Sequence, residues 1–304
     1  MLPQLLLPKM VGISKTSSLI ATVAYADIFG YPLTRRELIF WLLFHPVSRI
    51  RLPVDIQGVH SFVTLRGHQR LVRERLAKQK EQEKKWRIAR RASAWLSRVP
   101  TIKLIGVTGG LAMNNAKKED DVDLFFIVSD GTLWVSRLMA TILMDILGLR
   151  RRPGDKKFAD RVCLNMFMSE GSLALETKER DCFTAHEVLQ MTPIWERGNA
   201  YRKFLHANRW VSRFLPNAWE KIQKTLPRRS AGIIHNSLFI ILGFFEPLAK
   251  FFQLWYMGRH RTSEVITDTV IRFHPKDARV WVKRKLASRL ARYNIPLDKI
   301  FYGR

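Results

Sequence analysis

The stretch KLIGVTGGLAMNNAKKEDDVDLFFIV, residues 103–128, decides the fold. Its first apolar run predicts a strand at 104–108 that ends at the glycine pair Gly109-Gly110. A second strand is predicted to open at Asp121 and run to residue 128. Its apolar run, LFFIV, is bounded by polar residues, which is typical of a strand buried on both faces. The stretch therefore predicts strand, tight turn, short helix and strand.

Two carboxylates stand together at the start of the second strand. Residues two apart in a strand project to the same side, so Asp121 and Asp123 share one face. Burying two like charges side by side is costly unless a cation holds them. Carboxylate oxygens suit Mg²⁺, which also takes phosphate oxygens. Gly109 and Gly110 carry no Cβ, so a phosphate can approach their backbone N–H groups.

The glycine pair and the carboxylate pair together resemble the signature of the DNA polymerase beta-like nucleotidyltransferase superfamily. Gly109-Gly110 is followed, after ten residues, by Asp121-Val122-Asp123-Leu124, with a small residue at Ala112. The motif covers about a tenth of the chain. The resemblance implies that the glycines cradle the triphosphate of an NTP. It also implies that the two aspartates hold two Mg²⁺ ions, which stabilise the attacking and leaving oxygens.

A third carboxylate is expected from this resemblance in the next strand, predicted at 162–168. The chain departs from the pattern there, because the polar residue inside that strand is Asn165. An amide can offer a carbonyl oxygen to a metal, but it cannot accept a proton. The nearest acid is Glu170, just past the strand. In the basic loop before the strand, Arg150, Arg151 and Arg152 are candidates for phosphate contacts.

Composition limits the partners and the compartment. The chain has 304 residues, with 52 Lys and Arg against 26 Asp and Glu, a net charge of +26. This excess favours a polyanionic partner, either RNA or DNA or an anionic membrane surface. The two cysteines, Cys163 and Cys182, are too few for a disulfide framework and favour a reducing, cytoplasmic location. The N-terminal apolar run has no basic residue before it and is not expected to be a signal peptide.

The predicted fold class is α/β (α+β), with a nucleotidyltransferase-fold core built on a mixed sheet. Residues 1–65 are expected to form two or three helices and a small β element, which resembles a winged-helix domain. Residues 66–99 are expected to be a basic linker helix leading to the core at 100–195. Residues 196–304 are expected to be a helical C-terminal domain. The winged-helix-like part serves either nucleic-acid binding or only packing or protein contacts.

Capping signals mark several helices. Thr34 with Glu37 forms a capping box that predicts a helix at 35–44. Thr184 with Glu187 predicts a second capping box, in which His186 stands close to the helix start. An amphipathic helix is predicted at 133–147, stopped by Gly148.

Residues 231–257 are the most apolar stretch of the chain. Glu246, Pro247 and Lys250 interrupt it, so a spanning helix of about 20 apolar residues is not expected. We expect a buried helix pair bent at Pro247. The alternative is an interfacial helix that touches a membrane, since basic residues flank the stretch.

Two functions follow from the sequence. The first is Mg²⁺-dependent transfer of a nucleoside monophosphate from an NTP to an acceptor that the sequence does not identify. The second is a non-catalytic nucleic-acid-binding or regulatory protein that retains the fold, since fold alone does not establish chemistry.

Overall fold

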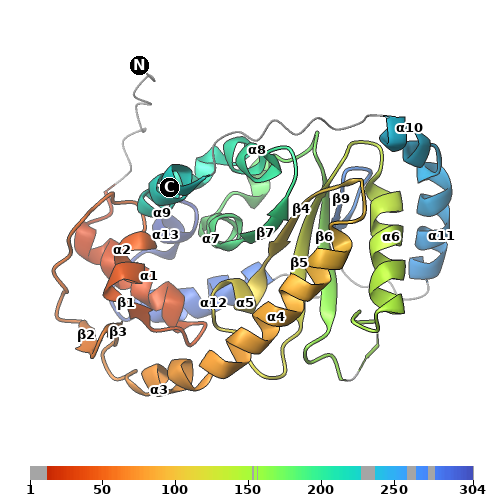
Figure 1. The fold of residues 1–304 in the computed structure, drawn as a ribbon. Helices are drawn as coiled ribbons and strands as arrows, with labels where there is room; N and C mark the ends of the chain where they lie inside the picture. The colour runs from red at the N-terminus through yellow and green to blue at the C-terminus, as the bar shows by residue number, and fades with distance from the viewer. Residues whose placement is uncertain are drawn as a thin grey trace.

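The computed structural model describes residues 12–152, 154–155, 157–226, 237–258, 265–272 and 278–303. Its centre is a mixed six-stranded sheet with the strand order β7-β4-β5-β6-β9-β8 (Figure 1). The strands are β4 (Ile102–Val107), β5 (Val122–Val128), β6 (Val162–Ser169), β7 (Thr192–Glu196), β8 (Val265–Ile266) and β9 (Val270–Arg272). Only β5 and β6 pair in parallel; the other neighbours are antiparallel. The predicted mixed α and β class is thus confirmed.

The opening stretch forms the elements predicted for it. Strand β4 ends directly before α5 (Gly109–Ala112), a single helical turn, and β5 returns beside β4. Apart from Asp123, every residue of β5 is buried, which agrees with a strand covered on both faces. The even-numbered side chains of β5, such as Leu124 and Phe126, enter one hydrophobic core, while Phe125 and Ile127 enter another. Asp123 therefore belongs to the face of Phe125 and Ile127.

Two long helices cover the even-numbered face. They are α4 (Gln79–Leu96) and α6 (Leu133–Ile146), and α4 crosses the front of the sheet in Figure 1. Helix α6 ends where the sequence predicts, since Gly148 adopts a φ of +62° that favours glycine. The opposite face packs against α7 (Cys182–Gln190) and α8 (Ala200–Ala207). This second face is the one that carries Asp123.

The N-terminal part follows the predicted order of helices and a small sheet. It contains α1 (Lys15–Asp27), β1 (Leu33–Thr34), α2 (Arg35–Phe40), β2 (Ile56–Val59) and β3 (Phe62–Leu65). The three strands form an antiparallel sheet of order β1-β3-β2. The capping box is confirmed, because Thr34 Oγ1 accepts from Glu37 N and the Glu37 carboxylate accepts from Thr34 N. Helix α2 ends earlier than predicted, and Phe44 already has a φ of +67°.

The basic linker is two helices rather than one. Helix α3 (Arg70–Ala77) and α4 meet at Lys78, whose Nζ donates to Asn115 Oδ1 at 2.7 Å. Part of the positive charge of the linker is paired inside the protein. Arg75 forms two 2.8 Å bonds with the Glu37 carboxylate and stacks on Tyr31. Other basic side chains of α4 are exposed, and they include Arg87, Arg90 and Arg91.

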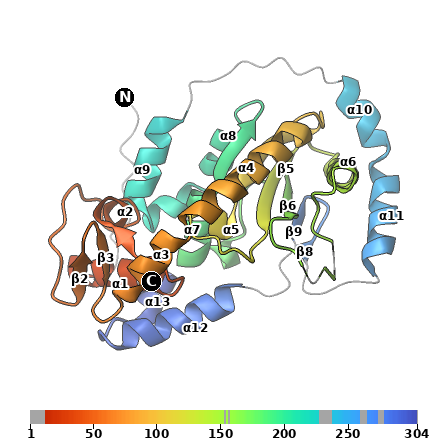
Figure 2. The same ribbon diagram turned by 60° about the horizontal axis from the view of Figure 1, so that its bottom comes forward.

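The described residues between 196 and 303 do not form a separate helical body. Strand β9 pairs with β6 and so completes the central sheet. Helices α12 (Ala278–Ala291) and α13 (Leu297–Phe301) share a core with α1, and they lie beside the N-terminal helices in Figure 2. The stretch also contains α9 (Pro216–Thr225), α10 (Ser237–Phe244), α11 (Glu246–Gly258) and the 3₁₀ turn Arg209–Arg213; another such turn, Thr177–Glu179, precedes α7. The prediction of a helical C-terminal domain missed β8 and β9, because both strands are very short.

Helices α10 and α11 lie against α6, on the side of the molecule away from the N-terminal part (Figure 1). The expected helix pair is present, but the break lies at Phe245 rather than at Pro247, because α10 ends at Phe244 and α11 begins at Glu246. The Glu246 carboxylate accepts from Trp134 N and Val135 N at the start of α6. The expected burial of this pair is wrong for its outer face, where large apolar side chains are exposed: Ile241, Phe244, Phe245, Leu248, Phe251, Phe252, Trp255 and Tyr256. Residues 231–236 lie outside the described part.

Candidate metal and nucleotide site

The predicted carboxylate pair stands at the start of β5. One oxygen each of Asp121 and Asp123 and the Cys163 Sγ lie within 4.8 Å of one another. Burial, and then the neighbouring Asp121 carboxylate, raise the pKa of Asp123 to about 7. Such a pair is stabilised in its ionised form when a cation binds between the carboxylates.

Cys163 is the site residue that sequence reasoning missed. In the parallel register of β5 and β6, Cys163 stands directly beside Asp123 and hydrogen-bonds to its carboxylate. Burial raises the pKa of the Cys163 thiol well above its ordinary value, so the group is a neutral thiol near pH 7. One signal in the sequence could have found it. Residues 163 and 165 are the two non-aliphatic positions at the start of an otherwise apolar strand, and residues two apart share one face of a strand.

Asn165 lies further along β6, at the point where the register shifts between Leu124 and Phe125. The residue opposite Asp123 is therefore Cys163, and Asn165 belongs to the wall of a neighbouring cavity. Its side chain is buried, and its Oδ1 has no hydrogen-bond partner among the described residues.

Glu170 is not brought to the carboxylate pair. Its backbone N–H donates to Val128 O, at the far end of β5 from Asp123. It follows Cys163 by seven residues, which is roughly 23 Å along a strand. The Glu170 carboxylate instead pairs with Lys203. The expectation that Glu170 replaces the third carboxylate is therefore corrected by strand geometry.

The three arginines of the basic loop have different partners. Arg151 Nη1 donates to Asp121 Oδ2 at 2.6 Å, and its guanidinium stacks on Phe158. Arg150 and Arg152 both form ion pairs with Asp145 on α6, at 2.9 and 3.0 Å. Only Arg151 therefore reaches the predicted site.

The glycine turn is pressed against the same carboxylates. Gly109 has a φ of +65°, and a Cβ built on it would lie 2.8 Å from Asp123 Oδ2. Any other residue would be strained and would displace this carboxylate. A Cβ on Gly110 would meet the Ala116 backbone at 3.4 Å. The turn thus leaves bare backbone beside Asp123, where a phosphate can approach.

Lys85 holds the loop that delivers the carboxylates. This side chain of α4 is fully buried, and its Nζ donates to Asp120 O at 2.5 Å and to Asp160 Oδ1 at 2.9 Å. Asp160 N in turn donates to Asp120 O at 3.2 Å. Lys85 is therefore a positioning residue for the segment directly before Asp121, and its charge does not face solvent.

The second predicted capping box is wrong. Helix α7 begins two residues earlier than expected, and the side chain that accepts from Thr184 N is Asp181. Glu187 consequently points away from the helix start, toward the buried face of the sheet. Burial raises the pKa of Glu187 to about 7 and lowers the pKa of His186 to about 4. His186 stacks on Tyr25 and bonds through Nδ1 to Cys182 O.

The arrangement fits one divalent cation better than the expected two. Asp121 and Asp123 provide two oxygen ligands, while the third nearby donor is a neutral thiol, a poor ligand for Mg²⁺. Within the described ranges no third carboxylate joins this group. Compared with known proteins, the chain matches no protein-family model and has no significant match among curated proteins.

Proposed function

We propose that the chain is a divalent-cation-dependent nucleotidyltransferase that transfers a nucleoside monophosphate from an NTP to an acceptor. In that reaction an acceptor oxygen bonds to the α-phosphorus, the bond to pyrophosphate breaks, and the acceptor proton is released. The observation that carries the proposal is the close approach of Gly109 to Asp123, at the start of a strand that also presents Asp121. This closeness supports the proposal, because a metal held by the two carboxylates would lie next to backbone that a phosphate could approach.

The chain's own residues have separable tasks in this proposal. Asp121 and Asp123 would hold Mg²⁺, which when bound supplies positive charge against the phosphate oxygens. The turn at Gly109 and Gly110 would bind phosphate through backbone N–H groups. Arg151 would pair with the phosphate of the bound NTP, since its guanidinium already contacts Asp121 and also suits phosphate.

Calorimetry with each NTP, with and without Mg²⁺, tests the proposal. We expect metal-dependent binding that is lost in Asp121→Ala and Asp123→Ala. Asp145→Ala is a matched control, because it removes a carboxylate that pairs with arginines outside the site. Turnover is then measured with labelled NTP and candidate acceptors. Equal NTP affinity in wild type and both site variants contradicts the assignment.

A non-catalytic nucleic-acid-binding role is the second candidate. It is favoured by the absence of a third carboxylate among the described residues near Asp123 and by the exposed arginines of α4. Affinity for RNA or DNA should then fall steeply with salt, because neutralised phosphates release counterions. Replacing Arg87, Arg90 and Arg91 by Gln should reduce the slope of that dependence. A flat salt dependence in wild type contradicts this role.

Peripheral association with an anionic membrane, from the cytoplasmic side, is proposed for the outer face of α11. Within the described ranges no helix combines the length and apolar character needed to cross a bilayer. The inner face of α11 packs on α6 through Ala249, Gln253 and Met257, while the outer face is uncharged and aromatic. Aromatic side chains are favoured at membrane interfaces, and the net charge of +26 favours anionic lipid.

A further inference from the structure

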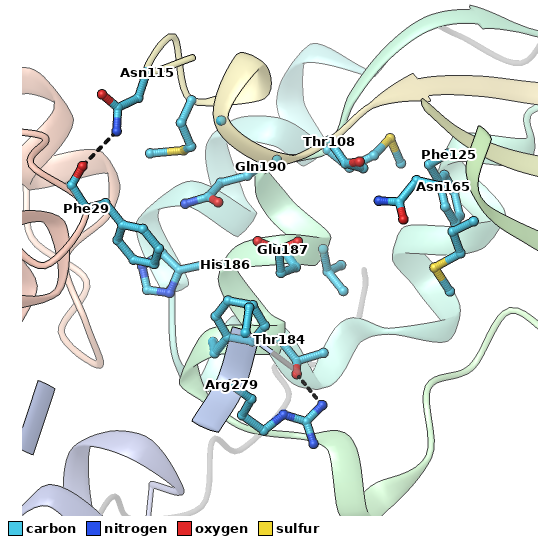
Figure 3. A pocket seen from close by; sticks show the side chains of 18 of the residues that line it. Phe29, Thr108, Asn115, Phe125, Asn165, Thr184, His186, Glu187, Gln190 and Arg279 are labelled. Carbon is cyan, nitrogen blue, oxygen red and sulfur yellow. Dashed lines mark hydrogen bonds between the residues drawn. The ribbon is translucent and has the colours of Figure 1, made fainter. Parts of the chain in front are cut away.

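A cavity of about 460 Å³ opens beside the glycine turn. Its walls come from α1, the turn after β4, strands β5 and β6, and α7 (Figure 3). Most of the lining is aromatic or aliphatic: Tyr25, Phe29, Trp41, Met113, Phe125 and Phe204. Gly109 and Gly110 also line it, so the cavity is continuous with the candidate nucleotide site. A space of this size and character is typical of a small-molecule site.

Several polar groups in this apolar wall lack a hydrogen-bond partner among the described residues, and they include Thr108 Oγ1, Asn165 Oδ1 and the Glu187 carboxylate. The Asn165 side chain is only 5% exposed, and its Oδ1 makes no hydrogen bond to any described residue. The raised pKa of Glu187 has burial as its cause, with no hydrogen bond or ion pair offsetting it. Figure 3 shows both side chains directed into the cavity, Asn165 from β6 and Glu187 from α7.

Leaving such groups unpaired is costly. A buried polar group without a partner costs about 1–3 kcal/mol, and buried carboxylates are normally paired. Three other polar side chains of the lining are already engaged. Asn115 donates to Phe29 O, His186 bonds to Cys182 O, and Arg279 contacts Asp181. The partners of Asn165 and Glu187 therefore come from water or from a bound molecule, and the largely apolar lining favours an organic one.

We propose that this cavity binds a small, largely apolar ring compound that offers an N–H or O–H group to Glu187 and Asn165. The carboxylate of Glu187 accepts a hydrogen bond from such a group, and the Asn165 amide can present either its oxygen or its NH₂. A volume of about 460 Å³ is too small for a folded protein or an RNA duplex. The assignment of this compound as the acceptor of the transfer rests on the proposed function.

Two sources share this chemistry: a separate acceptor molecule and the nucleoside of the NTP itself. They are separated by competition. A compound that occupies the cavity as acceptor binds together with Mg²⁺–NTP, whereas one that occupies a nucleoside pocket is displaced by it. Binding of the ring compound to the cavity is measured first without any NTP. A positive result therefore holds even when the nucleotidyltransferase proposal fails.

The probes are three naphthalenes that differ in one group: 2-naphthylethylamine, 2-naphthylethanol and 2-naphthylacetate. Saturation-transfer NMR with the full chain measures their affinities at pH 8, above the Glu187 pKa of about 7, so that this side chain is ionised. We expect the amine and the alcohol to bind at least tenfold more tightly than the carboxylate, which would meet Glu187. Glu187→Gln should reduce the difference between amine and carboxylate to less than threefold.

Two further variants keep the test independent of folding defects. Met113→Trp narrows the cavity at a half-buried position and should weaken amine binding at least tenfold. Met139→Trp, on α6 and outside the cavity, is the matched control and should leave it unchanged. Failure of all three probes to bind, or amine binding that is unchanged in both Met113→Trp and Glu187→Gln, overturns the proposal.

Discussion

Arg151 and Asp121 form a 2.6 Å ion pair across the mouth of the candidate metal site. The guanidinium pairs with a carboxylate that a metal cation would also bind, so Arg151 and the cation compete for Asp121. We predict that Arg151→Gln raises the affinity for Mn²⁺ or Mg²⁺ alone several-fold and lowers the affinity for metal–NTP. Calorimetry measures both. A loss of affinity for metal alone would contradict the competition, and Arg152→Gln, which loses a pair with Asp145, serves as control.

Gly109→Ala is predicted to damage both stability and the site. The positive φ costs roughly 1 kcal/mol or more for a residue with a Cβ, and the added Cβ displaces the Asp123 carboxylate. We expect a lower melting temperature and at least tenfold weaker metal-dependent NTP binding. Gly58→Ala is the control, since its φ is negative and no atom lies within 4 Å of the added Cβ. Unchanged NTP binding in Gly109→Ala would separate the turn from the nucleotide.

Lys85→Met is predicted to destabilise the fold by about 2–4 kcal/mol, because one Asp160 oxygen loses its donor and the Asp120 carbonyl keeps only the longer bond from Asp160 N. Lys84→Met is the matched control, since Lys84 pairs with the same Asp160 from an exposed position and its loss should destabilise the fold clearly less. Chemical denaturation measures both. Equal losses of unfolding free energy in the two variants would show that the burial of Lys85 does not increase its contribution to stability.

Glu187 and His186 are predicted to produce opposite pH dependences that nearly cancel. Folded Glu187 keeps its proton up to about pH 7 instead of 4.5, so its contribution to stability falls as pH rises across that window. Folded His186 takes up its proton only near pH 4 instead of 6.5, so its contribution rises as pH rises from 4 to 6.5. Each slope is at most about 1.4 kcal/mol per pH unit.

Single variants should reveal the pH dependence of stability that each of the two side chains causes. Relative to wild type, Glu187→Gln should gain stability between pH 4.5 and 7, and His186→Gln should lose it between pH 4 and 6.5. Asp123, whose pKa is also raised to about 7, is present in all three proteins; Glu187 is the smallest cause of that shift, so only a minor contribution from Asp123 remains in the Glu187→Gln difference. Denaturation at several pH values gives the free energies of unfolding. Parallel curves for the three proteins would remove both assignments.

The outer face of α11 is predicted to bind vesicles of phosphatidylserine and phosphatidylcholine. Phe251 and Trp255 are 65% and 60% exposed, and burying such a side chain contributes about 1.5–3 kcal/mol. Phe251→Ser and Trp255→Ser should each weaken co-sedimentation about tenfold, whereas Val280→Ser, also an exposed apolar residue but on α12, should not. Wild-type dimers that dissociate in Phe251→Ser would assign this face to a second copy of the chain instead.

The sequence was most informative where the local pattern and the tertiary environment agree. The two strands of residues 103–128, the glycine turn, the Thr34 capping box and the end of α6 all follow from local spacing. Cys163 could not be assigned in the same way, because its place beside Asp123 depends on the register of a parallel pair. The register is set by packing that no short motif reports.

Glu187 shows the opposite failure, in which a local motif was present but unused. Thr184 and Glu187 have capping-box spacing, yet Asp181 reaches the same backbone N–H first and starts the helix earlier. Glu187 then becomes available for the cavity. The exposed face of α11 was mispredicted for a related reason, since apolar composition indicates burial only when enough neighbouring surface exists to cover both sides.

The pairing of β6 with β9 has a consequence for biosynthesis. About a hundred residues separate these neighbouring strands, so the N–H and C=O groups along one side of β6 stay unpaired until the last part of the chain leaves the ribosome. Unpaired strand edges recruit other strands. A chain shortened to residue 226 should therefore accumulate in aggregates, and a nascent chain should depend on chaperones until β9 has been synthesised.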